Sequence, residues 1–363
     1  MGKKISVSYE GTPCYHIEIQ GDFSQLPQRL QELGYGANKA CIITESNVAP
    51  FYLHEIEHLL APVFSECISY VFEAGESSKN TDTVGKVYEC LIRHSFDRKD
   101  VLVALGGGVT GDLTGFAAAT YLRGIDFIQV PTTLLAQTDS SIGGKTGVDF
   151  MQYKNMVGAF YMPKLVYMNI STLQSLPGRQ FSSGAAELIK HGFIKDAGLL
   201  ETLKEDSREI MAQEPGCLED VIYRSCQVKR HVVEEDPKEK GERALLNFGH
   251  TIGHAIEKLS GFRLCHGECV ALGMVGAAYI SYLQGDLSQE QVGKLESILA
   301  GYGLPVKLSA FGHTPEEVLA ATKLDKKMES GKIKFVLLKR FGDAYITKEL
   351  TDERILEGIR YLY

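Results

Sequence analysis

Short apolar runs alternate with segments of helical period in the first half of the chain. Runs rich in β-branched residues cover residues 40–44, 67–72, 101–105 and 127–130, and a pattern of helical period covers residues 83–94. Such runs predict strands that are buried on both faces, and helices between them predict a mostly parallel sheet that is covered on both sides. The first half is therefore predicted to be an α/β domain.

The second half has a different pattern. Residues 184–206, 218–234, 251–259, 268–284 and 289–301 show helical periodicity, and a strand pattern returns only near residues 334–338. The change falls near Leu176-Pro177-Gly178. We therefore expect an α/β nucleotide-binding domain over residues 1–176 and a mainly α-helical metal- and substrate-binding domain over residues 177–363. Ligands of parallel sheets bind beyond the carboxyl ends of the strands, so a cleft between the domains is the expected site.

Charge and composition narrow the range of partners. The chain has 363 residues, with 38 Lys+Arg against 46 Asp+Glu, and this acidic balance argues against nucleic-acid binding, which needs clustered basic charge. Residues 1–6 lack the apolar stretch of a signal peptide, and the apolar stretch around residues 269–283 is too short to cross a bilayer. Eight cysteines without a CxxC pair are typical of reduced thiols. We expect a cytoplasmic protein that does not bind membranes.

A glycine-rich turn follows the strand predicted at residues 101–105. It reads Gly106-Gly107-Gly108-Val109-Thr110-Gly111-Asp112 and precedes a helical stretch. Glycines let the backbone approach a diphosphate, and free amides at the start of a helix bind it. The turn differs from a standard Rossmann site, because at least two strands precede it and no convincing acidic residue stands about twenty positions further on. Hydroxyl-rich residues 131–147 suit a ribose or phosphate. We predict a nucleotide site in another α/β arrangement.

Candidate metal ligands gather in the helical half. His250 and His254 stand four residues apart on one helix face, His266 follows, and Glu187 lies in an apolar helix where a carboxylate needs a partner. Two histidines and a carboxylate form a common catalytic zinc set with one position left for substrate. Spacing leaves open whether His250 pairs with His254 or either pairs with His266. Two cysteines are further but weaker candidates, since a closed thiolate site would be structural: Cys265 and Cys269.

Basic and polar residues next to these motifs would suit a phosphate monoester if they converge in a cleft. They are Lys145, Lys154 with Asn155, Lys190, Lys229, Arg243 and Lys326 with Lys327.

Taken together, these segments resemble the 3-dehydroquinate synthase family of sugar-phosphate cyclases over nearly the whole chain. Several long motifs in one order are far more specific than any single motif. The strongest are residues 106–112, 131–136 (Pro-Thr-Thr-Leu-Leu-Ala), 139–145 (Asp-Ser-Ser-Ile-Gly-Gly-Lys), 247–254 (Asn-Phe-Gly-His-Thr-Ile-Gly-His), 266–268 (His-Gly-Glu) and 325–327 (Asp-Lys-Lys). Two positions depart from the family pattern: Ser175 stands where Thr is frequent, and Asn169 where Asp is common.

The resemblance implies particular roles for these residues. It implies a divalent metal, zinc with cobalt as an alternative, bound by Glu187, His250 and His266, which leaves His254 to contact substrate. It implies NAD bound by Glu76, Lys79, Gly107, Gly108, Val109, Asp112, Thr132, Thr133, Lys145, Lys154, Thr172 and Ser175. It implies substrate contacts and catalysis from Asp139, Lys145, Asn155, Lys190, Lys229, Asn247, His254, Lys326 and Lys327, with Arg123 and Arg243 acting across a homodimer interface.

The reaction implied by the resemblance converts 3-deoxy-D-arabino-heptulosonate 7-phosphate to 3-dehydroquinate and phosphate, a step of aromatic amino-acid biosynthesis by the shikimate pathway. Transient oxidation by NAD, phosphate elimination, reduction, ring opening and aldol closure follow one another. Two alternatives share a metal and NAD: a metal-dependent polyol or alcohol dehydrogenase, and another sugar-phosphate cyclase. A dehydrogenase would release NADH, whereas a cyclase regenerates NAD in each turnover.

Overall fold

The chain divides into two compact units. The computed structural model describes residues 2–151, 153–239, 241–261, 263–309, 311–323, 328–329 and 332–363. The first unit comprises Met1–Leu176 with Lys229–Pro237, and the second comprises Pro177–Val228 with Lys238–Tyr363. Helix α8 (Pro215–Glu235) therefore begins in the second unit and ends in the first.

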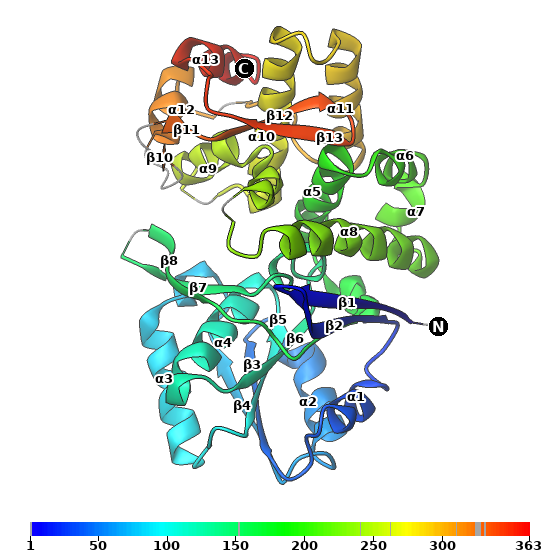
Figure 1. Ribbon diagram of the computed structural model, residues 1–363, viewed down its shortest axis with the longest axis vertical. Helices are drawn as coiled ribbons and strands as arrows, with labels where there is room; N and C mark the ends of the chain where they lie inside the picture. Colours follow the sequence, from blue (N-terminus) through cyan, green and yellow to red (C-terminus); the bar gives the residue numbers. More distant parts are fainter. Residues whose placement is uncertain are drawn as a thin grey trace. The chain divides into compact units, whose positions relative to one another are not determined.

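A seven-stranded sheet forms the centre of the first unit (Figure 1). Strand β1 pairs antiparallel with β2, and every other neighbouring pair in the sheet is parallel. In sheet order the strands are β1 (Lys3–Tyr9), β2 (Thr12–Gln20), β9 (Leu165–Asn169), β6 (Asp126–Pro131), β5 (Val101–Gly106), β3 (Lys39–Glu45) and β4 (Glu66–Phe72).

Helices cover both faces of this sheet, which explains why its central strands are apolar throughout. Helices α1 (Leu26–Glu32) and α2 (Ala49–Leu60) pack on one face with Val101 and Val103 of β5. Helices α3 (Thr81–Arg93) and α4 (Gly108–Thr120) pack on the other face with Leu102. Successive side chains of a strand point to opposite faces, so a strand between two helical layers has no polar side.

The glycine turn lies where the order of strands changes direction. The chain passes from β3 to β4 at one edge, whereas from β5 it passes to β6 and β9 on the other side. The carboxyl ends of β3 and β5, which are hydrogen-bonded neighbours, therefore mark a topological switch point. Open parallel sheets bind ligands at such points. Gly106, the last residue of β5, leads directly into the turn.

A separate hairpin follows β6 in the first unit. Its strands are β7 (Lys145–Phe150) and β8 (Tyr153–Phe160), which pair antiparallel. The segment before it contains a short π-helical stretch over Ala136–Ser140.

Helices dominate the second unit. They are α5 (Gly178–Ile194), α6 (Ala197–Glu205), α7 (Ser207–Met211), the first part of α8, α9 (His250–Leu259), α10 (His266–Leu283), α11 (Gln289–Gly301), α12 (Pro315–Thr322) and α13 (Asp352–Arg360). Two small antiparallel pairs accompany them, β10 (Met328–Glu329) with β11 (Lys332–Ile333) and β12 (Phe335–Arg340) with β13 (Asp343–Thr347). Among the described residues, no helix is long and apolar enough to cross a membrane.

Glycines let α9 and α10 approach each other closely. A Cβ atom added to Gly273 of α10 would lie 1.8 Å from the carbonyl oxygen of Gly249, the residue before α9. A Cβ at Gly253 of α9 would lie 2.8 Å from the carbonyl oxygen of Cys269. No side chain fits at either contact, so the two helix backbones meet directly. This contact fixes the histidines on the two helices relative to each other.

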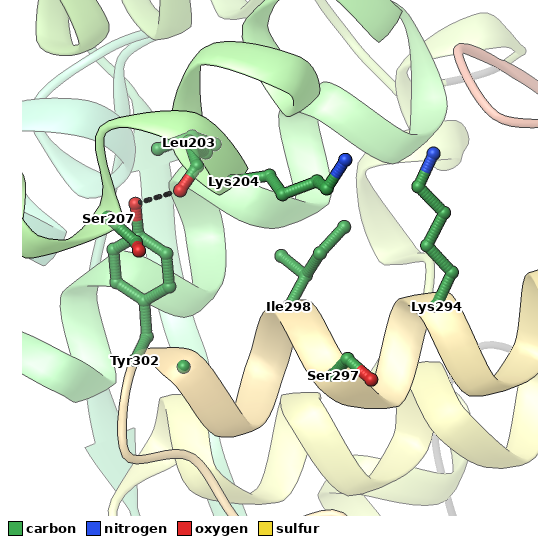
Figure 2. Close-up of a pocket in the computed structure, with 8 residues that line it drawn as sticks. Leu203, Lys204, Ser207, Lys294, Ser297, Ile298 and Tyr302 are labelled. Atoms are coloured by element: carbon green, nitrogen blue, oxygen red, sulfur yellow. Dashed lines mark hydrogen bonds between the residues drawn. The ribbon is translucent and has the colours of Figure 1, made fainter.

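A small pocket of about 110 Å³ lies between α6, α7 and α11 (Figure 2). The phenolic hydroxyl of Tyr302 donates a hydrogen bond of 2.7 Å to the carbonyl oxygen of Leu203 at its base. Lys204 and Lys294 lie at its rim, and both pair with Glu201. The pocket contains none of the residues predicted to bind cofactor, metal or substrate.

The predicted fold class is confirmed, although several elements were not predicted. The apolar runs correspond to β3, β4, β5 and β6, and the helical periods to α3 and to helices of the second unit. The segment predicted as helical over residues 184–206 forms two helices. Helix α5 ends at Ile194, and Asp196 caps α6 by accepting a hydrogen bond from Leu199 N. The α-helices and strands without a sequence prediction are β1, β2, β7, β8, β9, β10, β11, β13, α1, α2, α7, α12 and α13.

Candidate active site

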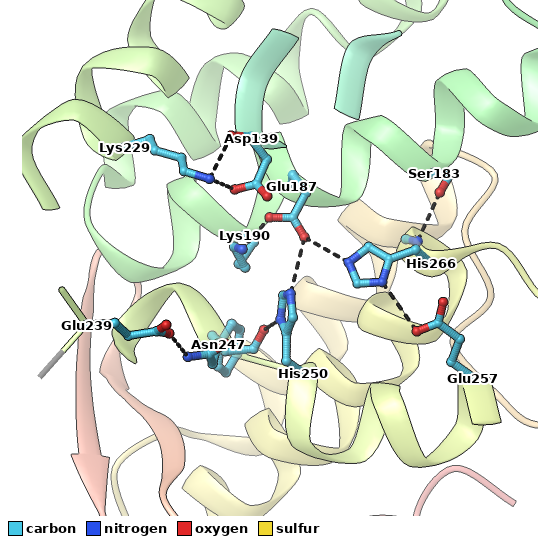
Figure 3. A network of polar contacts seen from close by, with 12 residues as sticks. Asp139, Ser183, Glu187, Lys190, Lys229, Glu239, Asn247, His250, Glu257 and His266 are labelled. Carbon is cyan, nitrogen blue, oxygen red and sulfur yellow. Dashed lines mark hydrogen bonds and ion pairs between the residues drawn. The ribbon is translucent and has the colours of Figure 1, made fainter. Parts of the chain in front are cut away.

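Three predicted metal ligands converge in the second unit (Figure 3). Glu187 of α5 is fully buried, and His250 and His266 are the first residues of α9 and α10. One ligand atom from each lies within 4.8 Å of the other two. The Nε2 atoms of His250 and His266 are 3.7 and 3.9 Å from Glu187 Oε1. Of the combinations that the spacing alone left open, the structure brings His250 and His266 together with Glu187.

The second nitrogen of each imidazole already has a neighbour. Nδ1 of His250 lies 3.1 Å from the carbonyl oxygen of Phe248, and Nδ1 of His266 lies 3.5 Å from Glu257 Oε2. Metal-binding histidines usually donate their other N–H to a carbonyl or carboxylate, which fixes the tautomer and aims the free nitrogen at the metal. Both Nε2 atoms are therefore oriented as ligands, and the donor set fits a divalent cation such as zinc.

Buried charges surround this cluster. Lys190, one turn after Glu187 and almost fully buried, forms an ion pair with Glu187 Oε2, while Oε1 faces the two histidines. Burial disfavours the charged form of His266, but Glu257 and then Glu187 outweigh burial and raise the pKa of His266. An anionic pocket that attracts a proton in this way also attracts a cation.

His254 lies beside the predicted ligands. Its ring centre is 5.2 Å from that of His250 and 5.9 Å from that of His266. Ligand atoms of His254, Glu257 and His266 also lie within 4.8 Å of one another, which makes this a second possible cation set. Neither Cys265 nor Cys269 belongs to a ligand cluster among the described residues.

Residues 265–268 hold His266 against α5. The amide of Gly267 donates to Ser183 Oγ at 2.9 Å, and a Cβ on Gly267 would lie 1.9 Å from the carbonyl oxygen of Ser183. Glu268 accepts a hydrogen bond from the amide of Cys265 and closes a capping box at the start of α10. Since Ser183 stands one turn before Glu187, this contact sets the spacing between Glu187 and His266.

Arg179 clamps the same turn from α5. Its guanidinium donates two hydrogen bonds of 2.7 Å to the Glu268 carboxylate and one to the carbonyl oxygen of Arg263. The Arg179 contact keeps the pKa of Glu268 below its ordinary value, although partial burial opposes this.

The predicted nucleotide-binding residues of the first unit follow the carboxyl ends of its parallel strands. Glu76 and Lys79 follow β4, residues 107–112 follow β5, Thr132 and Thr133 follow β6, and Thr172 and Ser175 follow β9. Because these strands are parallel, their carboxyl ends meet at one edge of the sheet. The fold brings together, at the switch point, segments that are up to about a hundred residues apart in sequence.

The glycine turn is shaped for close approach. Gly107 precedes α4 in an extended conformation, and Cβ atoms on Gly107 and Gly108 would lie 3.1 Å from Thr133 Cγ2 and Ser140 Oγ. The hydroxyl of Thr132 is buried and has no hydrogen-bond partner within the described part of the chain. A buried hydroxyl of this kind needs a partner, so Thr132 fits a role in ligand binding.

Lys79 links the predicted cofactor residues. It is buried, and its Nζ lies 2.7 Å from Asp112 Oδ2 and 2.6 Å from Asn155 Oδ1. Burial alone would lower the pKa of Lys79, but Asp112 and Glu76 raise it. Burial also raises the pKa of Asp112, against the effect of Lys79. Lys154 Nζ lies 3.6 Å from Glu76 Oε1 and extends the cluster.

Two predicted cofactor residues also have structural roles. The hydroxyl of Thr172 donates to the carbonyl oxygen of Asn169, and that of Ser175 lies 2.6 Å from Tyr52 Oη. Asn169 uses its amide oxygen to accept from Ser171 N, so the Asn at this position still serves as a helix cap. These contacts place Thr172 and Ser175 firmly after β9.

The remaining predicted residues fall into separate groups. In the first unit, Lys229 donates to the carbonyl oxygen of Asp139 at 2.7 Å and pairs with its carboxylate, and Lys145 is exposed at the start of β7. Val109 lies in the first turn of α4. In the second unit, Asn247 donates to Glu239 Oε1 at 3.0 Å, and Arg243 is almost fully buried. Lys326 and Lys327 lie outside the described residues.

Arg123 lies in an unusual turn. Leu122, Arg123 and Gly124 have φ angles of 50°, 69° and 123°, and both Leu122 and Arg123 are exposed. Left-handed conformations are costly for residues other than glycine and concentrate at functional sites. The left-handed backbone of this turn therefore costs free energy, and the turn leaves the side chain of Arg123 exposed.

Sequence reasoning missed Glu257, Arg179 and Asp149. Glu257 contacts the predicted metal ligand His266, Arg179 holds the turn that carries His266, and Asp149 contacts Asn155. Glu257 stands three residues after His254 on the same helix face, which is the one signal that could have indicated it.

Known protein families match both the N-terminal and the C-terminal part of the chain. Residues 69–183 match the 3-dehydroquinate synthase N-terminal family, and residues 184–328 match the 3-dehydroquinate synthase C-terminal family. The chain is 45% identical to a 3-dehydroquinate synthase of Ruminiclostridium cellulolyticum over 91% of each chain. It is 43% identical to one of Acetivibrio thermocellus over 98% of each. The chain belongs to the 3-dehydroquinate synthase family.

Membership of this family identifies the chain as an enzyme with 3-dehydroquinate synthase activity in the shikimate pathway, a phosphate-eliminating lyase. The expected family, enzyme class and activity are therefore confirmed, and the activity implies a sugar-phosphate substrate.

Solved structures of other cyclases share the two-domain fold. A 2-deoxy-scyllo-inosose synthase complexed with carbaglucose-6-phosphate, NAD+ and Co2+ has a TM-score of 0.88 and 26% identity, covering 99% of this chain and 100% of that one. A 2-epi-5-epi-valiolone synthase of Streptomyces hygroscopicus subsp. jinggangensis with NAD+ and Zn2+ has a TM-score of 0.87 and 27% identity, covering 96% of each. These relatives combine NAD+ with a divalent metal, and the His/Glu cluster described above can hold such an ion.

Proposed function

We propose that this 3-dehydroquinate synthase acts on 3-deoxy-D-arabino-heptulosonate 7-phosphate with NAD and one divalent metal ion, zinc, bound by Glu187, His250 and His266. The observation that supports this proposal most strongly is that the Nε2 atoms of His250 and His266 both point at Oε1 of the fully buried Glu187. Two histidines and one carboxylate leave a coordination position for a substrate oxygen. Cobalt suits the same mixed nitrogen and oxygen ligands.

The bound groups would supply two kinds of chemistry: a hydride acceptor that later returns the hydride, and a Lewis acid for the hydroxyl and carbonyl oxygens of the substrate. Oxidation of a ring hydroxyl to a ketone acidifies the neighbouring C–H bond, and loss of that proton expels phosphate. Reduction of the ketone, ring opening and an intramolecular aldol reaction then close the carbocycle. No net reduction of NAD occurs.

For NAD we propose the residues at the carboxyl edge of the first unit's sheet. The turn at Gly107 and Gly108 gives the diphosphate access to free amides at the start of α4. Thr132 offers a buried hydroxyl that lacks a partner within the described part of the chain. The other proposed contacts are Glu76, Lys79, Val109, Asp112, Thr133, Lys145, Lys154, Thr172 and Ser175.

For the substrate we propose basic residues that bind phosphate and carboxylate oxygens and polar residues that orient the ring. Lys190 and Lys229 are buried beside Glu187 and Asp139, and an ammonium group interacts more strongly with an anion where the dielectric constant is low. The proposed substrate set also includes Asp139, Lys145, Asn155, Asn247, Arg243, Lys326 and Lys327.

His254 is proposed as the proton relay. It lies beside the predicted metal ligands, and imidazole titrates near neutral pH. The phosphate of the substrate is a second base for the same proton, because it is adjacent to the carbon that loses it. Substitution of His254 distinguishes them: a large loss of kcat favours His254, and a small loss favours phosphate.

A homodimer in the cytoplasm is proposed, with Arg123 acting across the interface. Arg243, expected from the sequence to act there too, is almost fully buried within its own chain and is proposed for the substrate set instead. The strained backbone at Arg123 supports a functional role for its guanidinium, since an exposed arginine gains nothing structural from a left-handed turn.

The deciding experiment mixes the enzyme with the heptulosonate phosphate and NAD at a concentration far below that of substrate, and follows phosphate release and NADH absorbance together. We expect stoichiometric phosphate release without accumulation of NADH, loss of activity with excess chelator and recovery with zinc. A polyol dehydrogenase would accumulate NADH and release no phosphate, and a cyclase of another specificity would leave this substrate unchanged. Indifference to chelator would remove the metal from the mechanism.

A further inference from the structure

We propose that Asp149 is a positioning residue that joins the segment carrying Lys79 to the hairpin carrying Lys154 and Asn155. It holds these side chains in the arrangement in which they bind NAD and substrate. The inference rests on the cofactor and substrate roles proposed above for Lys79, Lys154 and Asn155.

A closed ring of three hydrogen bonds carries the inference. The amide of Asp149 donates to the carbonyl oxygen of Lys79 at 2.8 Å. Asp149 Oδ1 accepts from the amide of Asn155 at 2.8 Å. Asn155 Oδ1 accepts from Lys79 Nζ at 2.6 Å, which completes the ring. A parallel bridge between Asn80 and Asp149 holds the two segments side by side.

An irregularity in the hairpin explains why this carboxylate is needed. Strands β7 and β8 pair at Val148 with Val157 and at Phe150 with Tyr153. Asp149 alone therefore stands opposite residues 154–156, and the regular ladder is interrupted there. Bulges of this kind re-aim side chains and occur next to active sites. With the ladder interrupted, the amide of Asn155 takes its hydrogen-bond acceptor from the Asp149 side chain.

The same contact fixes an uncommon backbone conformation. Asn155 has φ of 50°, in the left-handed region that residues other than glycine rarely adopt, although asparagine tolerates it. In this conformation its side-chain oxygen reaches Lys79, whose ammonium group also binds Asp112 of α4. Asp149, itself a residue of β7, thereby connects the β8 strand of the hairpin to the segment that carries Lys79 and, through Lys79, to α4.

Asp149→Ala removes the acceptor and Asp149→Asn keeps an oxygen at the same position. We expect Asp149→Ala to weaken NAD binding, measured by calorimetry on the zinc-loaded enzyme, by about tenfold, as for loss of one hydrogen bond that organises a charged group. KM for the heptulosonate phosphate should rise with it, whereas kcat and zinc content change little. Asp149→Asn should stay within about twofold of the wild-type enzyme.

Asp100→Ala is the matched control. Asp100 is also a carboxylate of the first unit that ties distant segments by accepting backbone amides, those of Lys39 and Asp97, but it precedes β5 at the opposite end of the sheet. This variant should lower the melting temperature and leave NAD affinity unchanged.

Hydrogen exchange of the Asn155 amide gives a readout that does not depend on function. It should accelerate in Asp149→Ala but not in Asp149→Asn or Asp100→Ala. Wild-type NAD affinity in Asp149→Ala, or equal weakening in Asp100→Ala, would overturn the inference. Accelerated exchange with no NAD binding by the wild-type enzyme would instead overturn the proposed function.

Discussion

At the scale of single residues, three neighbouring residues of one short motif have three different roles. In His266-Gly267-Glu268, the histidine directs Nε2 toward Glu187 in the proposed metal site, the glycine permits backbone contact with Ser183, and the glutamate caps α10 and binds Arg179. None of the three residues can replace another, because the histidine supplies a ligand atom, the glycine leaves room by having no side chain, and the glutamate supplies a negative charge.

Glu257 should tune the metal affinity without binding the metal itself. Its Oε2 atom lies 3.5 Å from His266 Nδ1, so a charged acceptor orients the ring and raises the basicity of Nε2. We expect Glu257→Gln to weaken zinc binding by about 10- to 100-fold, as measured by competition with a chromogenic chelator. Activity per bound zinc should fall less.

Two comparisons make this prediction specific. Glu201→Gln changes a half-exposed glutamate of the same unit that pairs with Lys204 and Lys294, and zinc affinity should not change. Glu187→Gln should abolish zinc retention. If Glu257→Gln abolished it and Glu187→Gln did not, the ion would occupy the set of His254, Glu257 and His266 instead.

The sequence indicated candidate metal ligands more readily than the residues that hold them in place. His250 and His266 stand in recognisable motifs, Glu187 stands out as a carboxylate in an apolar helix, and each residue type has a recognisable ligand atom. Asp149 and Arg179 act through partners that are distant in sequence or lie across a bulge, such as Lys79 and Glu268. No local pattern encodes such contacts, because they exist only after the strands and helices have packed.

At the scale of elements, the proposed metal site depends on how closely α9 and α10 approach each other. His250 and His266 each begin a helix, so the distance between them follows the contact between the helices. Gly249, Gly253 and Gly273 make that contact at backbone distance. Gly249 also has a φ angle of 79°, in the left-handed region that favours glycine.

A methyl group at Gly273 should therefore disrupt both stability and metal binding. Gly273→Ala would place Cβ 1.8 Å from the carbonyl oxygen of Gly249, and the helices must separate. We expect a loss of about 1–3 kcal/mol in the free energy of unfolding, as in other overpacked cores, together with reduced zinc content. Denaturant titration and metal analysis of the purified variant measure these two effects.

Gly293→Ala provides the opposite case. Gly293 lies within α11, and nothing would lie within 4 Å of an added Cβ. Alanine is the better helix former, so this variant should gain up to about 1 kcal/mol and keep its zinc. Equal destabilisation by the two substitutions would show that helix contact is not the cause.

The elements that the sequence predicted are those with a uniform environment. Strands β3 and β5 are apolar because helices cover both faces, and α3 has one apolar face. Strand β8 alternates exposed and half-buried positions and includes Lys154 and Asn155, so its composition resembles a loop. Strand β2 begins with Thr12 and Pro13 and was missed for a similar reason.

At the scale of the whole molecule, the two units carry different ligand chemistry. The proposed metal ligands belong entirely to the second unit, and the proposed NAD contacts belong to the first. The change from alternating strands and helices to helices alone was visible in the sequence. The return of Lys229–Pro237 to the first unit was not, because the helical period of α8 continues without interruption across Val228.

This division predicts that zinc and NAD will protect different parts of the chain. A ligand that binds only the native state suppresses the opening of the structure that forms its site. In hydrogen exchange of the metal-free enzyme, adding zinc should slow α5 around Glu187 and the first turns of α9 and α10. Adding NAD without zinc should slow the exchange of residues 106–112 and 131–133 and leave the exchange of the second unit unchanged.

Calcium, which prefers six or more oxygen ligands, is the control and should protect neither region from exchange. Protection of residues 106–112 by zinc alone, or of α9 by NAD alone, would contradict this assignment of one ligand to each unit.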